Sequence, residues 1–389
     1  MTRLAPVNGH AVGHRDSNVL LLLNSLSVGG SEQKAVRLAN DLVGRMPQIV
    51  LAYLNPPDSL QHQVSPGVVT ACLGRNGKFS ISALRALGAL IREHDIRTVF
   101  AINLYPALYA TLAKLTARRR LRLVVAVNAT ELTTPKERRQ MLLYRRLLRC
   151  ADAVVFGADF QRRLWIARYG VRVKSDAAHV LYNGVDTSRF NSVSFTAERH
   201  KYRPAARFVV GTVGQMRPEK SQIELVRAVR ELRARGLDVG AILVGDGPER
   251  TRVEREIRDS GIEPHVRVVG EVYDVRPYLA AMDVFVLPSL TETFSNAALE
   301  AMAMARPVGA ARVGGMEEML QFGGGFTYPP GDLKLLCDHL AGLFGNEREL
   351  ALLGEQARTA VLGHFSWSSM VDNYLRVMVR APAGAVSAS

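Results

Sequence analysis

Apolar positions along the chain come in short runs separated by longer segments of helical period. The segment Gln222–Arg235, for example, has apolar residues three and four positions apart at Leu225, Val226, Val229 and Leu232, which predicts a helix. The short runs are apolar throughout and do not alternate, a pattern typical of parallel strands that are buried on both faces. Repeated strand and helix units predict a doubly wound α/β fold. The predicted strands are Asn18–Leu26, Gln48–Leu54, Val68–Leu73, Arg97–Asn103, Arg122–Asn128, Ala153–Gly157, His179–Val185, Phe208–Gly214, Gly240–Gly247, His265–Gly270, Asp283–Ser289 and Pro307–Gly315.

One polar stretch, Asn191–Arg207, interrupts this pattern near the middle of the chain. It contains Pro204 and has no apolar period, so we place a domain boundary there. A chain of 389 residues also suits two domains of roughly 150–200 residues each. The sequence therefore predicts two Rossmann-like domains, 18–195 and 200–360, which face a cleft where the carboxyl ends of the strands bind ligand. The two ends, 1–17 and 381–389, are rich in small residues and are expected to be disordered.

Composition narrows the class of protein. Hydrophobic residues make up 48% of the chain and charged residues 22%, which is typical of a soluble globular protein and excludes dominant disorder. The net charge of +14 predicts an anionic partner, either nucleic acid, a membrane surface or a phosphorylated substrate. The three cysteines are far apart, so we expect neither a disulfide framework nor a metal site. No signal peptide or spanning segment is recognisable, and we expect a cytoplasmic protein whose membrane contact, if any, is peripheral.

The strongest chemical signal lies between Asp283 and Glu317. Glu292 follows a predicted strand, and Glu300 lies on the next predicted helix after seven intervening residues. Their carboxylates are then on the order of 10 Å apart, which suits a sugar at one end and a ribose at the other. The helix N-terminus near Thr293–Ala297 adds a phosphate site between them. For the two glutamates alone, the alternative is one capping carboxylate and one solvated helix residue.

Six motifs in order and spacing resemble the family 4 group of retaining GT-B glycosyltransferases, over residues of about 18 to 378. The motif around Glu292 and Glu300 resembles the donor-binding segment of that family. The resemblance implies two Rossmann-like domains, with the acceptor bound by the first and a nucleotide sugar by the second. It also implies that the C-terminal helix, within 361–380, crosses back to the first domain. The other motifs are Val28–Gln33, Tyr182–Asp186 with Arg189 and Phe190, Gly214–Lys220, Val244–Pro248 and His364–Trp367.

The resemblance also implies roles for individual residues. Glu300 would bind the ribose hydroxyls and Glu292 the hydroxyls of the donor sugar, while Lys220 would meet the diphosphate. A cation there stabilises the leaving group as a metal would elsewhere. The family arginine is replaced by Gln215, so we expect Arg217 to reach the diphosphate, unless it is a solvated loop residue. Backbone contacts to sugar or phosphate would come from Thr293, Phe294, Ser295 and Asn296.

Three residues of the first domain complete the predicted site. Gly29 and Gly30 form a turn whose backbone can approach a pyrophosphate closely because it lacks Cβ atoms, although a plain turn is the alternative. Asn128 stands where the family often has a histidine that faces the donor sugar. Asn hydrogen-bonds hydroxyls but carries no proton, so a front-face mechanism that needs no histidine is favoured over an impaired enzyme. Nearby Glu131 is either a helper or an ordinary loop charge.

The basic charge is concentrated in one region. Lys114–Arg149 contains eleven Lys and Arg and two Glu, a net +9. Within it, Lys136–Arg149 predicts an amphipathic basic helix that could lie on anionic lipid, against the alternative of an ordinary packed helix. The apolar face is predicted to contain Met141, Leu142, Tyr144 and Leu148, and the cationic face Arg138, Arg145 and Arg149. Without a recognised module, nucleic-acid binding is not expected.

The sequence thus predicts an enzyme that transfers sugar from a nucleoside-diphosphate sugar to an acceptor hydroxyl, with retention. No cofactor is expected beyond the donor, and without an Asp-x-Asp motif no metal is expected either. From the habit of the family, the acceptor would be a glycan or lipid-linked sugar in surface polysaccharide or glycolipid assembly. The alternatives are a non-catalytic nucleotide-sugar binder, motivated by Asn128 and Gln215, and a GT-B epimerase or phosphorylase.

Overall fold

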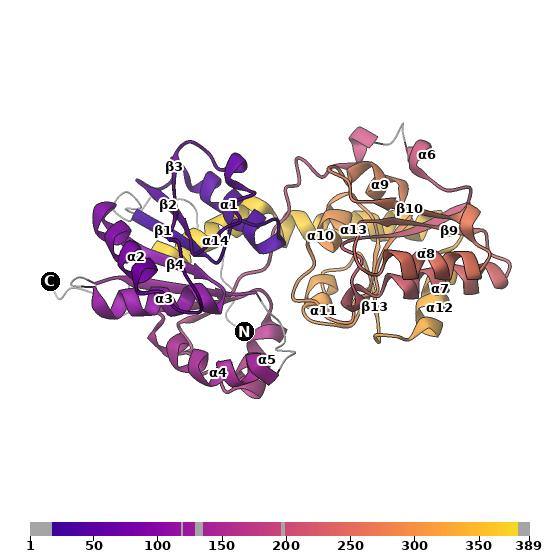
Figure 1. Cartoon of the computed structure of the whole chain (residues 1–389). Helices are drawn as coiled ribbons and strands as arrows, with labels where there is room; N and C mark the ends of the chain where they lie inside the picture. Colours follow the sequence, from indigo (N-terminus) through magenta and orange to yellow (C-terminus); the bar gives the residue numbers. More distant parts are fainter. Residues whose placement is uncertain (1–17, 118–119, 129–134, 196–198, 380–389) are drawn as a thin grey trace. The chain divides into compact units, whose positions relative to one another are not determined.

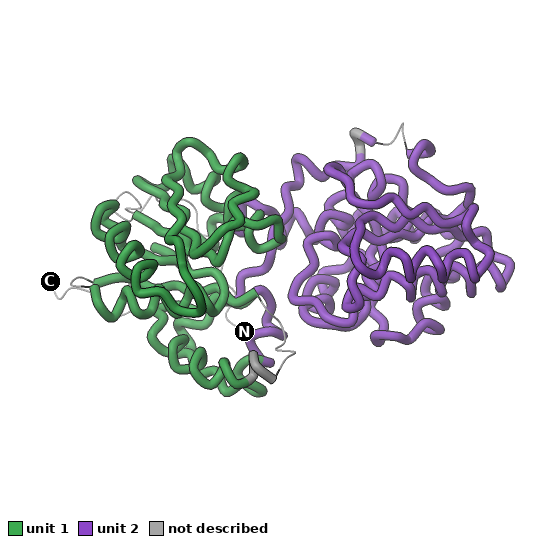
Figure 2. The backbone as a smooth tube through the Cα atoms, in the orientation of Figure 1, with its two compact units in different colours: residues 1–156, 165–179, 371–389 green, residues 157–164, 180–370 purple. Residues whose placement is uncertain are grey.

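The structure is a computed structural model that describes residues 18–117, 120–128, 135–195 and 199–379 (Figure 1). The chain forms two compact units (Figure 2). Unit 1 consists of residues 1–156, 165–179 and 371–389, and unit 2 of residues 157–164 and 180–370. The expected boundary at residues 191–207 lies inside unit 2. The expected disordered ends, 1–17 and 381–389, and Glu131 lie outside the described residues.

Unit 1 is built on a seven-stranded sheet with the order β3-β2-β1-β4-β5-β6-β7. Strand β1 pairs in parallel with β2 and with the central strand β4, and β5 pairs in parallel with β4 and β6. The strands are β1 Asn18–Leu23, β2 Ile49–Tyr53, β3 Val68–Cys72, β4 Ile96–Ile102, β5 Arg122–Val127, β6 Ala153–Phe156 and β7 Ala178–Val180. The helices of this part of the chain are α1 Gly30–Leu42, α2 Ile81–Glu93, α3 Leu104–Thr116, α4 Pro135–Leu147 and α5 Asp159–Tyr169.

The end of the chain belongs to both units. Helix α14, Trp367–Val379, begins in unit 2 and continues in unit 1 from Val371. In unit 1 the hydroxyl of Thr98 in β4 donates to the carbonyl of Met378 at 3.0 Å. The ring of Tyr374 packs edge-on against Phe100 of the same strand, with 5.6 Å between centroids. The last turns of α14 are therefore part of the core of unit 1.

Unit 2 is built on a six-stranded parallel sheet with the order β10-β9-β8-β11-β12-β13. Its strands are β8 Phe208–Val213, β9 Val239–Val244, β10 Val266–Gly270, β11 Val284–Leu287, β12 Val308–Ala311 and β13 Gly325–Tyr328. Its helices are α6 Arg199–Tyr202, α7 Gln222–Ala234, α8 Arg250–Asp259, α9 Arg276–Ala281, α10 Asn296–Ala303, α11 Met316–Leu320, α12 Leu333–Leu343 and α13 Glu347–His364. Two parallel α/β sheets are thus confirmed.

Successive side chains of β11 show how both faces of this sheet are covered. Val284 and Val286 pack in a core with residues of α7, α8 and α12. Phe285 and Leu287 pack in a second core with residues of α9, α10 and α13. Because side chains alternate between the faces of a strand, the strand must be apolar throughout. This explains why the sequence shows continuous apolar runs.

Strand order fixes where each unit can bind a ligand. In unit 2 the chain moves outward from β8 through β9 to β10, and the later strands β11 to β13 lie on the other side of β8. The helices that follow β8 and β11 therefore lie on opposite faces of the sheet, and a ligand-binding crevice is expected at the carboxyl ends of these two strands. In unit 1 the corresponding point lies between β1 and β4. Within the described part of the chain, no helix is both long and apolar enough to span a bilayer.

Candidate active site

An ion pair joins the loops after β8 and β11, where the ligand crevice is expected. Lys220 ends the short 3₁₀ turn Pro218–Lys220 that follows β8, and its ammonium group pairs with the carboxylate of Glu292, which follows β11. The hydroxyl of Ser289 donates to the same carboxylate oxygen at 3.3 Å. The amide of Leu290 donates to the carbonyl of Glu219 at 2.8 Å, so the backbones of the two loops are joined as well. Two residues predicted from the sequence therefore meet at the switch point of the sheet.

Ser289 is a residue of this site that the sequence reading did not single out. It is fully buried immediately after the apolar strand β11, and its hydroxyl contacts Glu292. A buried polar residue needs a hydrogen-bond partner, and here the partner is the predicted carboxylate. The signal available in the sequence is a serine that ends an apolar strand.

The loop that carries Glu292 is fixed in place by two glycines. Gly314 has φ +57°, and a Cβ atom there would lie 1.8 Å from the carbonyl oxygen of Glu292. The amide of Gly315 donates to the carbonyl of Thr293 at 2.9 Å. Only a glycine at position 314 tolerates both the left-handed backbone and the close approach. The loop between β12 and α11 is thus a support for the Glu292 loop.

We expect Gly314→Ala to lower the free energy of unfolding by about 2–4 kcal/mol, because it adds backbone strain and a direct clash. Equilibrium urea unfolding measures this change. Gly363→Ala is the matched control, since it lies within helix α13 and a Cβ there meets no atom within 4 Å. The control should be neutral or stabilising by about 0.5–1 kcal/mol. Equal stability of the two variants would contradict this account of the loop.

The side chains of Phe294 and Ser295 serve the fold. Phe294 is 4% exposed and stacks on Tyr182 with 4.8 Å between ring centroids. Its carbonyl accepts a hydrogen bond from the Asn183 side chain at 3.0 Å. Ser295 is the N-cap of α10 and accepts a hydrogen bond from the amide of Ala298 at 3.3 Å. The first amides of α10, from Asn296 onward, have no acceptor within the helix and remain suited to an anion.

Glu300 lies in the middle of α10 and is the most perturbed carboxylate near this crevice. Burial raises its pKa to about 7, and the charge of Arg189 acts weakly in the opposite direction. Within the described residues its carboxylate accepts no hydrogen bond. The side chain is partly buried, and a carboxylate in such a place that accepts no hydrogen bond is available to a ligand. The arrangement suits a ligand that brings hydroxyl groups.

The loop after β8 exposes the side chains of Gln215 and Arg217. Among the residues that the structure describes, the side chain of Arg217 forms one ion pair, with Glu219 at 3.9 Å. In the neighbouring loop, which follows β9, a close backbone contact requires glycine. A Cβ at Gly245 would lie 2.0 Å from the carbonyl oxygen of Gly214, so these two loops touch backbone to backbone. The exposed side chain of Arg217 thus has no close ionic partner within the described part of the chain.

In unit 1 the structure gathers polar groups at the carboxyl end of the sheet. The side-chain amide of Asn128 donates to the hydroxyl of Ser31 at 2.9 Å. The backbone amide of Asn128 donates to the side-chain oxygen of Asn103 at 3.3 Å. Gly29 is the N-cap of α1, and a Cβ at Gly30 would meet nothing within 4 Å. Gly30 thus leaves open space beside the first turn of α1. Asn128, Gly29 and Gly30 belong to unit 1, and the other predicted site residues belong to unit 2.

The basic helix α4 has a different exposed face from the predicted one. Met141, Tyr144 and Leu148 are buried in the core of unit 1, but Leu142 is 52% exposed, so its assignment to the same apolar face is wrong. Helical geometry puts Leu142 on the opposite side, next to Leu143, which is 50% exposed. The exposed face of α4 therefore presents two leucines among its arginines. The side chain of Arg138 lies outside the described part of the chain.

Comparison with known proteins defines the class. Residues 207–346 match the profile described as glycosyl transferases group 1, and residues 28–189 match that of glycosyltransferase family 4. The structure of Anabaena HepE in complex with UDP superposes with a TM-score of 0.80 at 22% identity, covering 92% of this chain and 98% of HepE. Sucrose-phosphate synthase from Thermosynechococcus elongatus has a TM-score of 0.77 at 18% identity, covering 92% and 97%. The fold is GT-B, and these matches define a glycosyltransferase.

A relative in sequence identifies the family. The GDP-mannose-dependent alpha-(1-6)-phosphatidylinositol monomannoside mannosyltransferase of Mycolicibacterium smegmatis is 30% identical over 291 residues, 72% of this chain and 75% of that protein. The lipopolysaccharide core biosynthesis glycosyltransferase LpsE of Rhizobium meliloti is 31% identical over 180 residues, about half of each chain. The chain belongs to the family 4 glycosyltransferases, a retaining family, and is an enzyme that transfers sugar from a nucleotide sugar.

Proposed function

We propose that unit 2 binds a nucleoside-diphosphate sugar at the crevice between β8 and β11 and that its sugar passes, with retention and without a metal, to an acceptor hydroxyl held by unit 1. The ion pair of Lys220 with Glu292 carries this proposal. It joins the two loops of the switch point, where ligands bind in doubly wound sheets. Both charges have chemical work to do on a nucleotide sugar.

The ion pair defines the free state in this proposal. A diphosphate is a stronger anion than a single carboxylate, so it competes with Glu292 for the ammonium group of Lys220. Glu292 then accepts hydroxyl hydrogen bonds from the sugar, and Glu300 accepts those of the ribose. Arg217 and the first amides of α10 add positive charge around the phosphates.

The proposed step takes place on one face of the sugar. The acceptor oxygen forms a bond to the anomeric carbon on the side from which the diphosphate departs, and the bond from that carbon to the phosphate oxygen breaks. The proton of the acceptor hydroxyl passes to the departing phosphate oxygen, so no histidine is needed at Asn128. Lys220 stabilises the negative charge that develops on the leaving group.

A thermal-shift screen tests the donor site directly. The relatives differ in nucleotide, since one is GDP-mannose-dependent and the HepE structure contains UDP. The screen therefore includes UDP, GDP, ADP and their sugars. A ligand that binds only the folded protein raises the melting temperature, and we expect one nucleotide series to do so. No shift with any member, or a shift that Glu300→Gln leaves unchanged, would count against this site.

The acceptor is proposed from the relatives. One acts on a phosphatidylinositol monomannoside and another takes part in lipopolysaccharide core biosynthesis, and both names describe sugars attached to lipid. We assign this enzyme to the assembly of a glycolipid or surface polysaccharide. Transfer of labelled sugar to a lipid-extractable product distinguishes this role from that of an epimerase or a phosphorylase.

The exposed face of α4 fits a lipid-linked acceptor, and we propose that it binds the anionic surface of a membrane from the cytoplasmic side. Leu142 and Leu143 are exposed there, next to the exposed Arg146. A hollow of about 340 Å³ nearby is lined by Arg145, Arg146, Arg149, Arg172 and Gly170 and has no acidic residue in its lining. Apolar insertion and attraction to lipid phosphates act together on such a surface.

We expect the double variant Leu142→Ser and Arg146→Gln to reduce flotation with phosphatidylglycerol-containing vesicles about five- to twentyfold, because it removes one inserted side chain and one charge. The matched control is Leu352→Ser with Arg348→Gln, which changes an exposed leucine and an exposed arginine four positions apart on α13. Equal flotation of both double variants would contradict the assignment of α4. High salt should weaken the binding of the wild type.

A further inference from the structure

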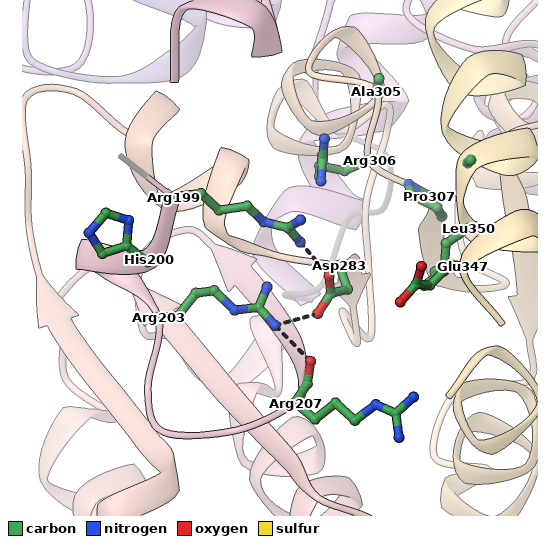
Figure 3. A pocket seen from close by; sticks show the side chains of 11 residues that line it. Arg199, His200, Arg203, Arg207, Asp283, Ala305, Arg306, Pro307, Glu347 and Leu350 are labelled. Atoms are coloured by element: carbon green, nitrogen blue, oxygen red, sulfur yellow. Dashed lines mark hydrogen bonds and ion pairs between the residues drawn. The ribbon is translucent and has the colours of Figure 1, made fainter. Parts of the chain in front are cut away.

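Unit 2 has a hollow at the amino ends of its strands, whereas the proposed donor site lies at their carboxyl ends. Its volume is about 590 Å³ (Figure 3). Arg207 precedes β8, Asp283 precedes β11 and Pro307 precedes β12, so the hollow lies at the amino ends of these strands. Glu292, in contrast, follows the carboxyl end of β11. A ligand in this hollow would therefore occupy a site that the transfer reaction does not use.

Positive charge is in excess in the lining of this hollow. Its charged side chains are the two carboxylates of Asp283 and Glu347 and the four guanidinium groups of Arg199, Arg203, Arg207 and Arg306. With His200 neutral, the lining carries a net charge of about +2. Excess positive charge in a partly enclosed hollow attracts an anion.

Asp283 cannot neutralise this cluster, because its own oxygens are already occupied. One oxygen pairs with Arg199, and the other accepts hydrogen bonds from Arg203 at 2.9 Å and from the amide of Val209 at 2.7 Å. Figure 3 shows the guanidinium groups of Arg199 and Arg203 pointing toward Asp283. Glu347 lies across the hollow and forms no ion pair within the described part of the chain. Asp283 thus pairs with two of the four guanidinium groups, and both of its oxygens are occupied.

Several guanidinium donors in the lining have no acceptor among the described residues. The Nε of Arg199 is buried without a hydrogen-bond partner. The guanidinium of Arg207 has no hydrogen bond or ion pair and lies 5.5 Å from the ring of Phe344. Arg306 donates to the carbonyls of Met304 and Met282, at 3.1 Å each, which leaves its other Nη unused. The buried Nε of Arg199 is costly unless a ligand accepts from it, whereas the exposed guanidinium of Arg207 is available at the surface of the hollow.

The electrostatic environment of Arg306 agrees with the excess of positive charge in the lining. Burial lowers its pKa to about 10, and the charge of Arg199 lowers it further while Asp283 opposes the shift. A bound anion would reverse this by adding negative charge beside the two arginines. Arg203 has a structural role, because it donates to the backbone carbonyls of Ala281 and Arg207 at 2.8 and 2.9 Å. Hydrogen bonds to the backbone do not account for the guanidinium of Arg207 or for the unused Nη of Arg306.

We propose that this arginine-lined hollow binds a phosphate-bearing anion with two or more negative charges, either a phosphomonoester or a diphosphate. Arginine is the side chain that matches the phosphate oxygens with paired donors, and several arginines around one hollow match a multiply charged group. A small phosphorylated metabolite and a phosphorylated lipid headgroup share this chemistry. The site is independent of the donor site, and its ligand would bind whether or not a nucleotide sugar is present.

The test uses the full chain and calorimetric titration with pyrophosphate. Arg207→Gln removes a guanidinium that holds no hydrogen bond within the described residues, so the variant should fold normally. The matched control is Arg255→Gln, an exposed arginine of α8 outside the hollow. We expect Arg207→Gln to weaken binding about tenfold and the double variant with Arg199→Gln about a hundredfold, with Arg255→Gln unchanged.

Lys220→Ala separates this site from the donor site, because pyrophosphate could also bind near Lys220. We expect Lys220→Ala to retain the pyrophosphate binding that Arg207→Gln weakens. The proposal is overturned when Arg207→Gln binds as tightly as Arg255→Gln, when Lys220→Ala alone abolishes binding, or when the wild type binds no pyrophosphate at millimolar concentration.

A second arm identifies the source of the phosphate. Flotation with phosphatidylcholine vesicles that contain phosphatidic acid presents the same phosphomonoester on a lipid. If Arg207→Gln weakens this flotation as well as pyrophosphate binding, the ligand is a lipid headgroup. If it weakens only pyrophosphate binding, the ligand is a soluble phosphate ester. The proposed lipid surface on α4 contributes equally to both proteins and does not affect this comparison.

Discussion

Replacing Lys220 by alanine is expected to lower kcat for sugar transfer about 10²- to 10³-fold, with a much smaller change in the affinity for the nucleotide sugar. In the proposed mechanism the ammonium group stabilises charge that develops on the diphosphate as the bond to the anomeric carbon breaks, so its contribution would be greatest in the transition state. In the free protein Lys220 is held at the switch point by its ion pair with Glu292. The measurement is steady-state transfer to the acceptor, with donor affinity measured separately by calorimetry.

The control for Lys220→Ala is Lys334→Ala. Lys334 is 84% exposed and pairs with Asp338 on the surface of unit 2, so its removal should leave kcat unchanged. A kcat for Lys220→Ala close to that of the control would remove Lys220 from the reaction. Rescue of Lys220→Ala by an added small amine would support a role for the missing charge.

Replacing Glu300 by glutamine is expected to weaken donor binding about 10- to 100-fold, because the ionised carboxylate accepts stronger hydrogen bonds from the ribose than a neutral amide does. Titration of the matching nucleoside diphosphate measures the effect. In the wild type, protonation of Glu300 competes with ligand, since its pKa is raised to about 7. Affinity should therefore fall as the pH is lowered through 7, and this dependence should be absent in Glu300→Gln.

The same substitution is expected to stabilise the free protein at high pH. The folded-state pKa of Glu300 is raised from 4.5 to about 7, so ionisation works against folding. The stability that the protonated group contributes is complete below pH 4.5 and is lost as the pH rises through about 7. At pH 8, Glu300→Gln should gain at most about 3 kcal/mol in the free energy of unfolding, and less at pH 5. If Glu300→Gln bound ligand more weakly and was also less stable at pH 8, then the ionised carboxylate of Glu300 would not be a group that lowers stability and improves ligand binding.

Much of the fold could be predicted because most strands are covered on both faces. The missed strand was β13, Gly325–Tyr328, which is short, begins with glycine and is only partly buried, so it lacks an apolar run. The strand predicted at His179–Val185 is observed only at Ala178–Val180. From Val180 the chain belongs to unit 2, and Val185 pairs with Ser366 in an isolated bridge. The apolar pattern there reflects packing in a second core.

The residues of the proposed donor site could be named from the sequence where they follow one another in short motifs. Glu292 and Glu300 lie in one strand-to-helix segment, and Lys220 lies in a motif whose spacing could be read directly. The arginine-lined hollow could not be found in this way, because its side chains come from residues 199–207, 283, 306 and 347 and are brought together only by the fold. The exposure of Leu142 was also missed, since a helix with apolar residues on two sides does not reveal which side packs.

The path of the chain has a consequence for engineering this enzyme. The first unit is completed by residues 371–379, whose Met378 carbonyl and Tyr374 ring are held by β4. A chimera that combines the first unit of this protein with the nucleotide-binding unit of a relative therefore needs two splice points. The terminal segment has to come from the same parent as the first unit, since a foreign tail would meet strand β4 with unmatched side chains.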